Sequence, residues 1–161
     1  WTYKKLRLLK IIMVKIFIAC TRKLKWKNLS LIERAFSLAQ KVQPEFVLDL
    51  SNLSYEEFLQ KIAEAYAVIL VSLGDISPNL VLDALRLGKP VILTTETGLR
   101  QRLGDSVIWV NPKDEKDISE KIIWLANPEN YEHSCQNVKT LNLKHSWSDI
   151  ADEFLDMAKE L

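Results

Sequence analysis

The sequence has 161 residues and a formal net charge of +1, with 48% hydrophobic and 27% charged residues. The apolar content excludes a disordered chain, and four glycines and two cysteines exclude a collagen-like repeat and a disulfide scaffold. The longest apolar run spans residues 65–71, far short of the roughly 20 residues that a membrane-spanning helix needs. Cys20 and Cys135 have no CxxC spacing, which fits a reducing compartment and predicts a cytoplasmic location.

Positive charge is concentrated at the beginning of the chain, where residues 1–27 hold nine Lys and Arg and no acid. Such a segment is typical of a region that faces phosphate, nucleic acid or acidic lipid, although a solvated Lys-rich linker fits the pattern equally well. We interpret residues 1–13 as a basic linker or the truncated end of a preceding domain. Residues 14–161 are interpreted as one domain. The chain begins with Trp1, and Met13 is an alternative true start.

The first half of the chain alternates between predicted strands and helices. A β-rich run predicts a strand over residues 14–20. Ser30 and Glu33 have capping-box spacing, which predicts a helix from there to about residue 43. Residues 46–50 predict a second strand, and Ser54 with Glu57 predicts a capped helix that continues to about residue 65. Residues 67–71 predict a third strand that is apolar on both faces.

The second half continues the same alternation. Ser77-Pro78 predicts a helix with proline at its first position, and Gly88 predicts the end of that helix. Further strands are predicted over residues 90–93 and 107–110. Three helices are predicted over about residues 115–126, 128–142 and 147–160, of which the last carries an unbroken apolar stripe.

This alternation predicts an α/β fold, a three-layer, Rossmann-like parallel sheet flanked by helices on both faces. Ligands of such sheets bind beyond the carboxyl ends of the strands. The candidate ligand-binding segments are therefore residues 20–28, 50–54, 72–79 and 94–99.

Several familiar ligand motifs are missing from these segments. The four glycines cannot form G-x-G-x-x-G, and the sequence contains neither GK[ST] nor G-x-S-x-G. Its two histidines offer no metal-ligand cluster, so no metal site is predicted. The sequence therefore excludes a dinucleotide-binding fingerprint and a P-loop.

Two features of the remaining pattern point to chemistry. The first loop holds four cations, including Arg22 and Lys27, and leads into a helix N-terminus. Cations at that position repel the helix dipole unless an anion is bound, which indicates a phosphate site, although a Lys-rich turn is more often simply solvated. Asp83 lies in a predicted helix with apolar Leu80 and Leu87 as neighbours, so it is either a partnered acid at a packed face or a partly exposed one.

Two longer patterns have fixed spacings. Arg22 lies five positions before Lys27, and Asn28 follows. The second pattern begins with Asp75 and continues, after seven residues, with Asp83-Ala84. It ends in a predicted strand of the form Gly-x-Pro-Val, which is Gly88-Lys89-Pro90-Val91. Shorter matches occupy residues 94–98, 109–114 and 146–147. Together these residues resemble the C-terminal half of GT-B-fold retaining glycosyltransferases, the half that binds the sugar donor, and especially glycosyltransferase family 4.

The resemblance implies a role for each matching residue in a transferase that uses a nucleoside-diphosphate sugar. Arg22 and Lys27 would be catalytic groups that neutralise the departing diphosphate, and Asp75 would hold a hydroxyl of the donor sugar. Asp83 would accept hydrogen bonds from the ribose. The helix start would add donors to the diphosphate site through Ser77, Asn79 and Leu80. The resemblance implies no metal and no cofactor besides the nucleotide-sugar co-substrate.

The sequence also departs from the family pattern. Both acids are Asp where the family has Glu, and Pro78 has no N–H group where the family has a glycine-rich donor segment. Residues 98–101 lack the acid of the family's Gly-x-Pro-Glu element, and residues 44–66 are short for the two strands usual there.

Partners and alternatives follow from these matches and departures. The resemblance implies a hexosyltransferase whose acceptor is bound by an N-terminal domain that is not in this chain. No nucleic-acid partner is expected, and peripheral contact with an anionic membrane at its cytoplasmic face is left open. Two alternatives stay open: a binding-only domain that has lost catalysis, and a module that binds anionic polymers through the basic N-terminal segment.

Overall fold

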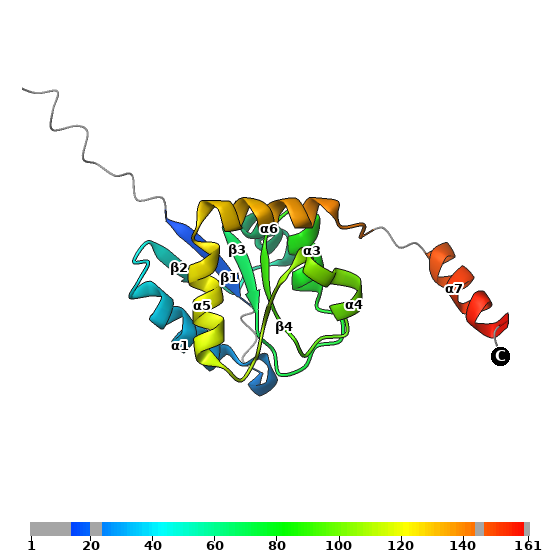
Figure 1. Cartoon of the computed structure of the whole chain (residues 1–161), viewed down its shortest axis with the longest axis horizontal. Helices are drawn as coiled ribbons and strands as arrows, with labels where there is room; N and C mark the ends of the chain where they lie inside the picture. The colour runs from blue at the N-terminus through cyan, green and yellow to red at the C-terminus, as the bar shows by residue number, and fades with distance from the viewer. Residues whose placement is uncertain (1–13, 20–23, 144–146, 160–161) are drawn as a thin grey trace, which may run out of the picture.

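The computed structural model describes residues 14–19, 24–143 and 147–159, and it contains a five-stranded parallel sheet (Figure 1). The strands are β1 (Lys15–Ala19), β2 (Phe46–Asp49), β3 (Ala67–Leu70), β4 (Val91–Thr94) and β5 (Ile108–Val110). They lie in the order β2-β1-β3-β4-β5, and every neighbouring pair is parallel. The predicted α/β class and Rossmann-like layering are confirmed.

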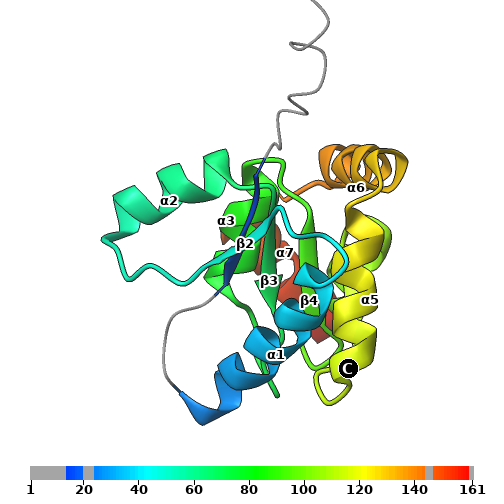
Figure 2. The same ribbon diagram turned by 90° about the vertical axis from the view of Figure 1, so that its left-hand side faces the viewer.

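Helices cover both faces of the sheet (Figures 1 and 2). One face packs against α1 (Leu29–Gln40) and α5 (Glu115–Leu125), and the other against α2 (Tyr55–Glu64), α3 (Asn79–Arg86) and α4 (Arg100–Leu103). Helix α6 (Pro128–Thr140) runs across one end of the sheet, and Val138 packs into the second face. Two short 3-10 turns, η2 (Lys25–Lys27) and η3 (Gly104–Ser106), complete the domain.

The central strands are buried because their side chains supply the core of both layers. Phe17 of β1 is fully buried, and its ring lies 5.1–5.4 Å from the rings of Phe36, Phe46 and Tyr66. All residues of β3 and β4 are buried as well. Strands that are enclosed on both faces lose their alternation of apolar and polar residues, which explains the continuous apolar runs in the sequence.

Helix starts show where local sequence rules hold and where they fail. The Ser54–Glu57 capping box of α2 is confirmed, with both of its reciprocal hydrogen bonds present. The capping box predicted at Ser30 is wrong, because α1 begins at Leu29 and Asn28 is its N-cap. Proline at the first position of α3 is also wrong, since Pro78 is the N-cap and Asn79 the first helical residue.

Tertiary contacts explain the shifted start of α1. Asn28 has φ 59°, in the left-handed region that Asn tolerates better than most residues. Its side-chain amide donates to the carbonyl of Val71 at 3.1 Å and to that of Pro112 at 2.7 Å. These bonds hold Asn28 against two distant loops, so the helix begins directly after it.

The predicted last helix is confirmed as α7 (Trp147–Lys159), but none of its residues from 148 to 159 is buried. Phe154, Leu155 and Met157 on its apolar stripe are each more than half exposed, and α7 stands clear of the other helices in Figure 1. In the described part of the chain, no helix has the length and apolar character needed to cross a membrane. The predictions for residues 1–13 and for Arg22 fall outside the described residues.

Candidate functional site

The strand order creates a crevice at the carboxyl ends of β1 and β3. From β1 the chain moves outward to β2, and it then returns to β3 on the opposite side of β1. The loop after β1 therefore leads to one side, and the loop after β3 leads to the other. The gap between two such loops is where α/β folds bind their ligands. A cleft of about 540 Å³ lies there.

The cleft brings together most of the predicted site residues. It is lined by Lys27, Asp75, Ser77, Asn79, Leu80 and Asp83. Arg22 is the one predicted site residue that lies outside the described residues. Trp26 and residues 51–53 also line the cleft, and they belong to loops that the sequence predicted to bind a ligand. Sequence reasoning missed Tyr55 and Phe58, which come from α2. The signal for Tyr55 was its place directly after the predicted loop at residues 50–54.

Lys27 and Asp75 form an ion pair inside the cleft. The ammonium Nζ of Lys27 lies 2.5 Å from Oδ2 of Asp75, and both side chains are almost buried, with exposures of 10% and 13%. The same Nζ lies 4.1 Å from the centre of the Trp26 ring. The amide of Leu73 donates to the carbonyl of Trp26 at 2.8 Å, which ties the two loops together. The predicted phosphate-binding cation and the predicted sugar-binding acid are therefore direct partners.

Asp83 is buried and its carboxylate is paired on both sides. Its exposure is 8%, so the partly exposed alternative is wrong. The hydroxyl of Tyr55 donates to Oδ2 at 3.2 Å, and Arg86 donates to Oδ1 at 3.3 Å. Desolvation and the negative charge of Asp83 raise the pKa of Tyr55, so the phenol keeps the proton that it donates.

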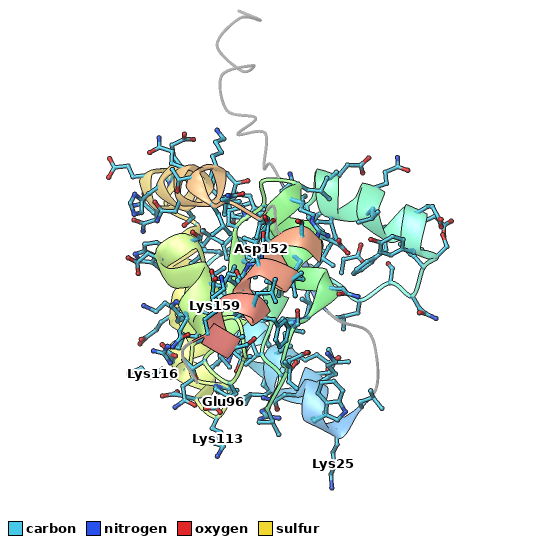
Figure 3. All side chains as sticks on the ribbon, turned by 90° about the vertical axis from the view of Figure 1, so that its right-hand side faces the viewer. Lys25, Glu96, Lys113, Lys116, Asp152 and Lys159 are labelled. Carbon is cyan, nitrogen blue, oxygen red and sulfur yellow. The ribbon has the colours of Figure 1, made fainter. Side chains whose placement is uncertain are left out.

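The N-terminus of α3 points into the same cleft. Val81 and Leu82 already donate to the carbonyl of Pro78. The amides of Asn79 and Leu80 are the first two of the helix and have no intrahelical acceptor, and both residues line the cleft. Figure 3 shows exposed Lys25, Lys113 and Lys116 at this end of the domain, together with the acid Glu96.

A close backbone contact holds the loop that carries Asp75. The amide of Asp75 donates to Glu96, and the amide of Gly98 donates to the carbonyl of Asp75. A Cβ atom at Gly98 would lie 2.7 Å from the carbonyl oxygen of Ile76, closer than packed atoms approach.

We therefore expect Gly98→Ala to lower the free energy of unfolding by about 1–3 kcal/mol, because backbone has to move to admit the methyl group. Urea unfolding followed by circular dichroism measures the change. Gly74→Ala is the matched control, since nothing lies near a Cβ at that position. Equal stability of the two variants would contradict the close contact.

The rim of the cleft at Ser51 is held by a charged network. Lys61 Nζ lies 2.5 Å from Oδ2 of Asp49 and 3.1 Å from Ser51 Oγ, and Asp49 also accepts from the amide and hydroxyl of Ser51. The hydrogen bonds from Lys61 and Ser51 lower the pKa of Asp49. The network thus favours the ionised carboxylate in the folded state.

This lowered pKa predicts a pH-dependent contribution to stability. The network stabilises the fold above the ordinary pKa of an aspartate, about 3.9, and the contribution disappears as pH falls through the lower pKa of the folded state. Asp49→Asn should therefore destabilise the protein at neutral pH and lose this effect in acid. Urea midpoints of the native protein and the variant, measured from neutral pH down to about pH 3, test the expectation. A difference that is constant with pH would contradict it.

The described residues contain no group of three or more His, Cys, Asp and Glu side chains that could hold a metal ion. What the cleft offers instead is a lysine, two carboxylates, helix amides and aromatic rings. These groups are suited to a ligand that combines an anion, hydroxyl groups and a flat ring.

Comparison with known proteins supports the fold. No family model matches the chain, and no curated protein matches its sequence. Solved structures do match. A sucrose-phosphate synthase from Thermosynechococcus elongatus is 15% identical, with a TM-score of 0.63 over 98% of this chain and 47% of that one. A glycosyltransferase from Rickettsia africae is also 15% identical, with a TM-score of 0.65 over 92% of this chain and 48% of that one.

A third match is the N-terminal domain of a trehalose-6-phosphate phosphatase from Candida albicans, 16% identical, with a TM-score of 0.59 over 87% of this chain and 42% of that one. The chain thus spans less than half the length of each of these structures. At this identity the likeness shows the fold alone, a Rossmann-like α/β domain that glycosyltransferases share.

Proposed function

We propose that this domain is the donor-binding half of a retaining glycosyltransferase that uses a nucleoside-diphosphate sugar. One observation carries the proposal: six of the seven residues expected from the resemblance to bind the donor line a single cleft where the strand order reverses. Five of them belong to the loop and helix start over residues 75–83, and the fold brings Lys27, 48 positions before Asp75, into contact with this segment.

In this proposal the diphosphate binds between Lys27 and the start of α3. The amides of Asn79 and Leu80 donate to phosphate oxygens, and Lys27 supplies positive charge, with Arg22 as the second cation. Because the diphosphate gains negative charge as the glycosidic bond breaks, these contacts strengthen in the transition state. Each charge-assisted hydrogen bond contributes about 1.5–3 kcal/mol.

The ion pair with Asp75 gives Lys27 a defined position before the donor arrives. A bound diphosphate would share the ammonium group with Asp75, since Lys27 has three N–H donors. Asp75 keeps free lone pairs, with which it would accept a hydroxyl of the transferred sugar. The pair therefore places the phosphate-binding and sugar-binding groups side by side.

Asp83 is proposed to bind the ribose. An ionised carboxylate has about four acceptor sites, of which Tyr55 and Arg86 use one each. The remaining sites can accept from the two ribose hydroxyls. The aromatic wall formed by Tyr55 and Phe58 lies beside this position and would contact the base.

Acceptor binding is proposed to come from a second domain, as the resemblance to family 4 implies. A cytoplasmic location and peripheral contact with anionic membrane remain part of this proposal. The binding-only alternative is favoured by one specific feature, Pro78, which has no N–H at the start of α3. Donor hydrolysis by a protein that includes the acceptor domain separates the two.

Ribose recognition supplies the direct test. We expect Asp83→Asn to weaken binding of a ribonucleoside diphosphate by about tenfold, because an amide accepts fewer hydrogen bonds than a carboxylate. Binding of inorganic pyrophosphate should change little, since it has no ribose. Titration calorimetry with UDP, GDP, ADP and pyrophosphate measures both effects.

The matched control is Asp152→Asn on α7, where the side chain is exposed (Figure 3). It should leave every affinity unchanged. Equal losses for nucleotide and pyrophosphate in Asp83→Asn would assign Asp83 a structural role. An affinity that is the same for every nucleobase and falls steeply with salt concentration would favour the anionic-polymer alternative.

A further inference from the structure

A second hollow lies at the opposite end of the sheet from the cleft that contains Lys27 and Asp83, which we call the nucleotide cleft. It has a volume of about 390 Å³, within the range of about 300–1,000 Å³ that is typical of small-molecule sites. Its walls include Val91 at the start of β4, Asp105 before β5, and residues of α5 and α6. The nucleotide cleft lies beyond the carboxyl ends of β1 and β3, so the two sites do not overlap.

An exposed tryptophan supplies apolar surface to this hollow. Trp124, near the end of α5, is 39% exposed, whereas Ile122 and Leu125 of the same helix are fully buried. Its indole therefore has a face available for a ligand. Trp109 of β5 also borders the hollow, but its side chain packs on the other face of the sheet, with the guanidinium of Arg100 5.6 Å from the ring centre.

The polar groups around the indole of Trp124 are mixed in character. Lys121 and Asp105 contribute one positive and one negative charge, while His133 and Asn137 are adjacent on α6, with Nε2 and Nδ2 3.3 Å apart. Asn137 also donates to the carbonyl of Asp105 at 3.1 Å, which fastens α6 to the segment before β5. The wall is therefore held in place by the fold and offers donors and acceptors without a dominant charge.

We infer that this hollow binds a neutral oligosaccharide. A pyranose ring has an apolar face of C–H bonds with slight positive charge, which suits the negative face of an indole. Its hydroxyl groups need donors and acceptors in similar number, and the rim provides both. A phosphorylated ligand is disfavoured because the negative charge of Asp105 offsets the positive charge of Lys121.

The inference goes beyond the proposed function, because a sugar held here is remote from the diphosphate site and cannot be the one transferred. If the proposed function holds, the hollow would retain an acceptor or product glycan while the nucleotide cleft exchanges its donor. Sugar binding itself depends only on the hollow and can be tested without any transferase activity.

The test uses the indole and side-chain amide N–H signals of the ¹⁵N-labelled protein, titrated with maltotriose, cellotriose and chitotriose at millimolar concentrations. We expect saturable shifts at the indole of Trp124 and the amide of Asn137 with at least one trisaccharide, and no shift at Trp26 in the nucleotide cleft. Trp124→Ala should weaken binding about tenfold or more, read at Asn137. Trp26→Ala is the matched control and should retain it.

Three outcomes would overturn the inference: no saturable shift with any trisaccharide, unchanged affinity in Trp124→Ala, or binding of a nucleoside at this hollow instead. His133→Ala provides a second variant at an exposed position, so a folding defect in Trp124→Ala leaves the test intact. Saturation with UDP should not change the trisaccharide affinity. Competition between them would show that the sites are not separate, whereas failure to bind UDP at all bears only on the proposed function.

Discussion

Replacing Lys27 with methionine is expected to lower the free energy of unfolding by about 3 kcal/mol. The substitution removes the only charged partner that the described residues offer Asp75, whose side chain is 13% exposed. An acid left almost buried without its counter-charge costs about 3–5 kcal/mol, and the opening of the cleft to solvent favours the lower end of that range. Urea unfolding at neutral pH measures the loss.

Two further variants separate the pair from the rest of the fold. Lys25→Met, in the same turn but exposed, should change stability by less than about 0.5 kcal/mol. The double variant Lys27→Met with Asp75→Leu should recover most of the loss, because no unpaired charge remains. A double variant as unstable as Lys27→Met alone would contradict the ion-pair explanation.

The double variant also separates stability from ligand binding. If Lys27 binds the diphosphate, a refolded double variant should still bind a nucleoside diphosphate about tenfold more weakly than the native protein. Recovery of both stability and affinity would restrict Lys27 to a structural role.

Phe17→Ala is expected to destabilise the domain by about 3–5 kcal/mol, because it leaves a cavity at the centre of a closely packed layer. Phe17 is fully buried, and its ring meets three other aromatic rings at centroid distances of 5.1–5.4 Å. It also lies on β1, the strand that leads to the loop of Lys27. Thermal and urea unfolding measure the effect.

The same substitution on α7 provides the control. Phe154 is 66% exposed, so Phe154→Ala removes little buried surface and should leave stability within about 0.5 kcal/mol. A large loss at Phe154 would show that α7 packs against the domain in solution. A small loss at Phe17 would contradict its place in the core.

Local patterns were enough to predict the five strands and the longer helices of this fold, but not α4 or the two 3-10 turns. Apolar runs indicated the strands, and those of β3 and β4 are continuous because a strand buried on both faces has no polar alternation. The Ser54–Glu57 capping box indicated the start of α2, since both of its hydrogen bonds form within four residues. The resemblance then named the residues of one cleft, and the structure brings all of those that it describes together.

Contacts between distant residues were decided only by the tertiary structure. The start of α1 depends on Asn28 bonding to Val71 and Pro112, and Ser30 lost the capping role that its spacing predicted. Tyr55 was found as the partner of Asp83 only when α2 and α3 were placed side by side. The sequence by itself determined the alternation of strands and helices, because periodicity and capping act over a few residues. The order of the strands depends on how the layers pack, and so do the Lys27–Asp75 pair and the hollow beside Trp124. Local sequence patterns do not determine the distances between residues on different layers.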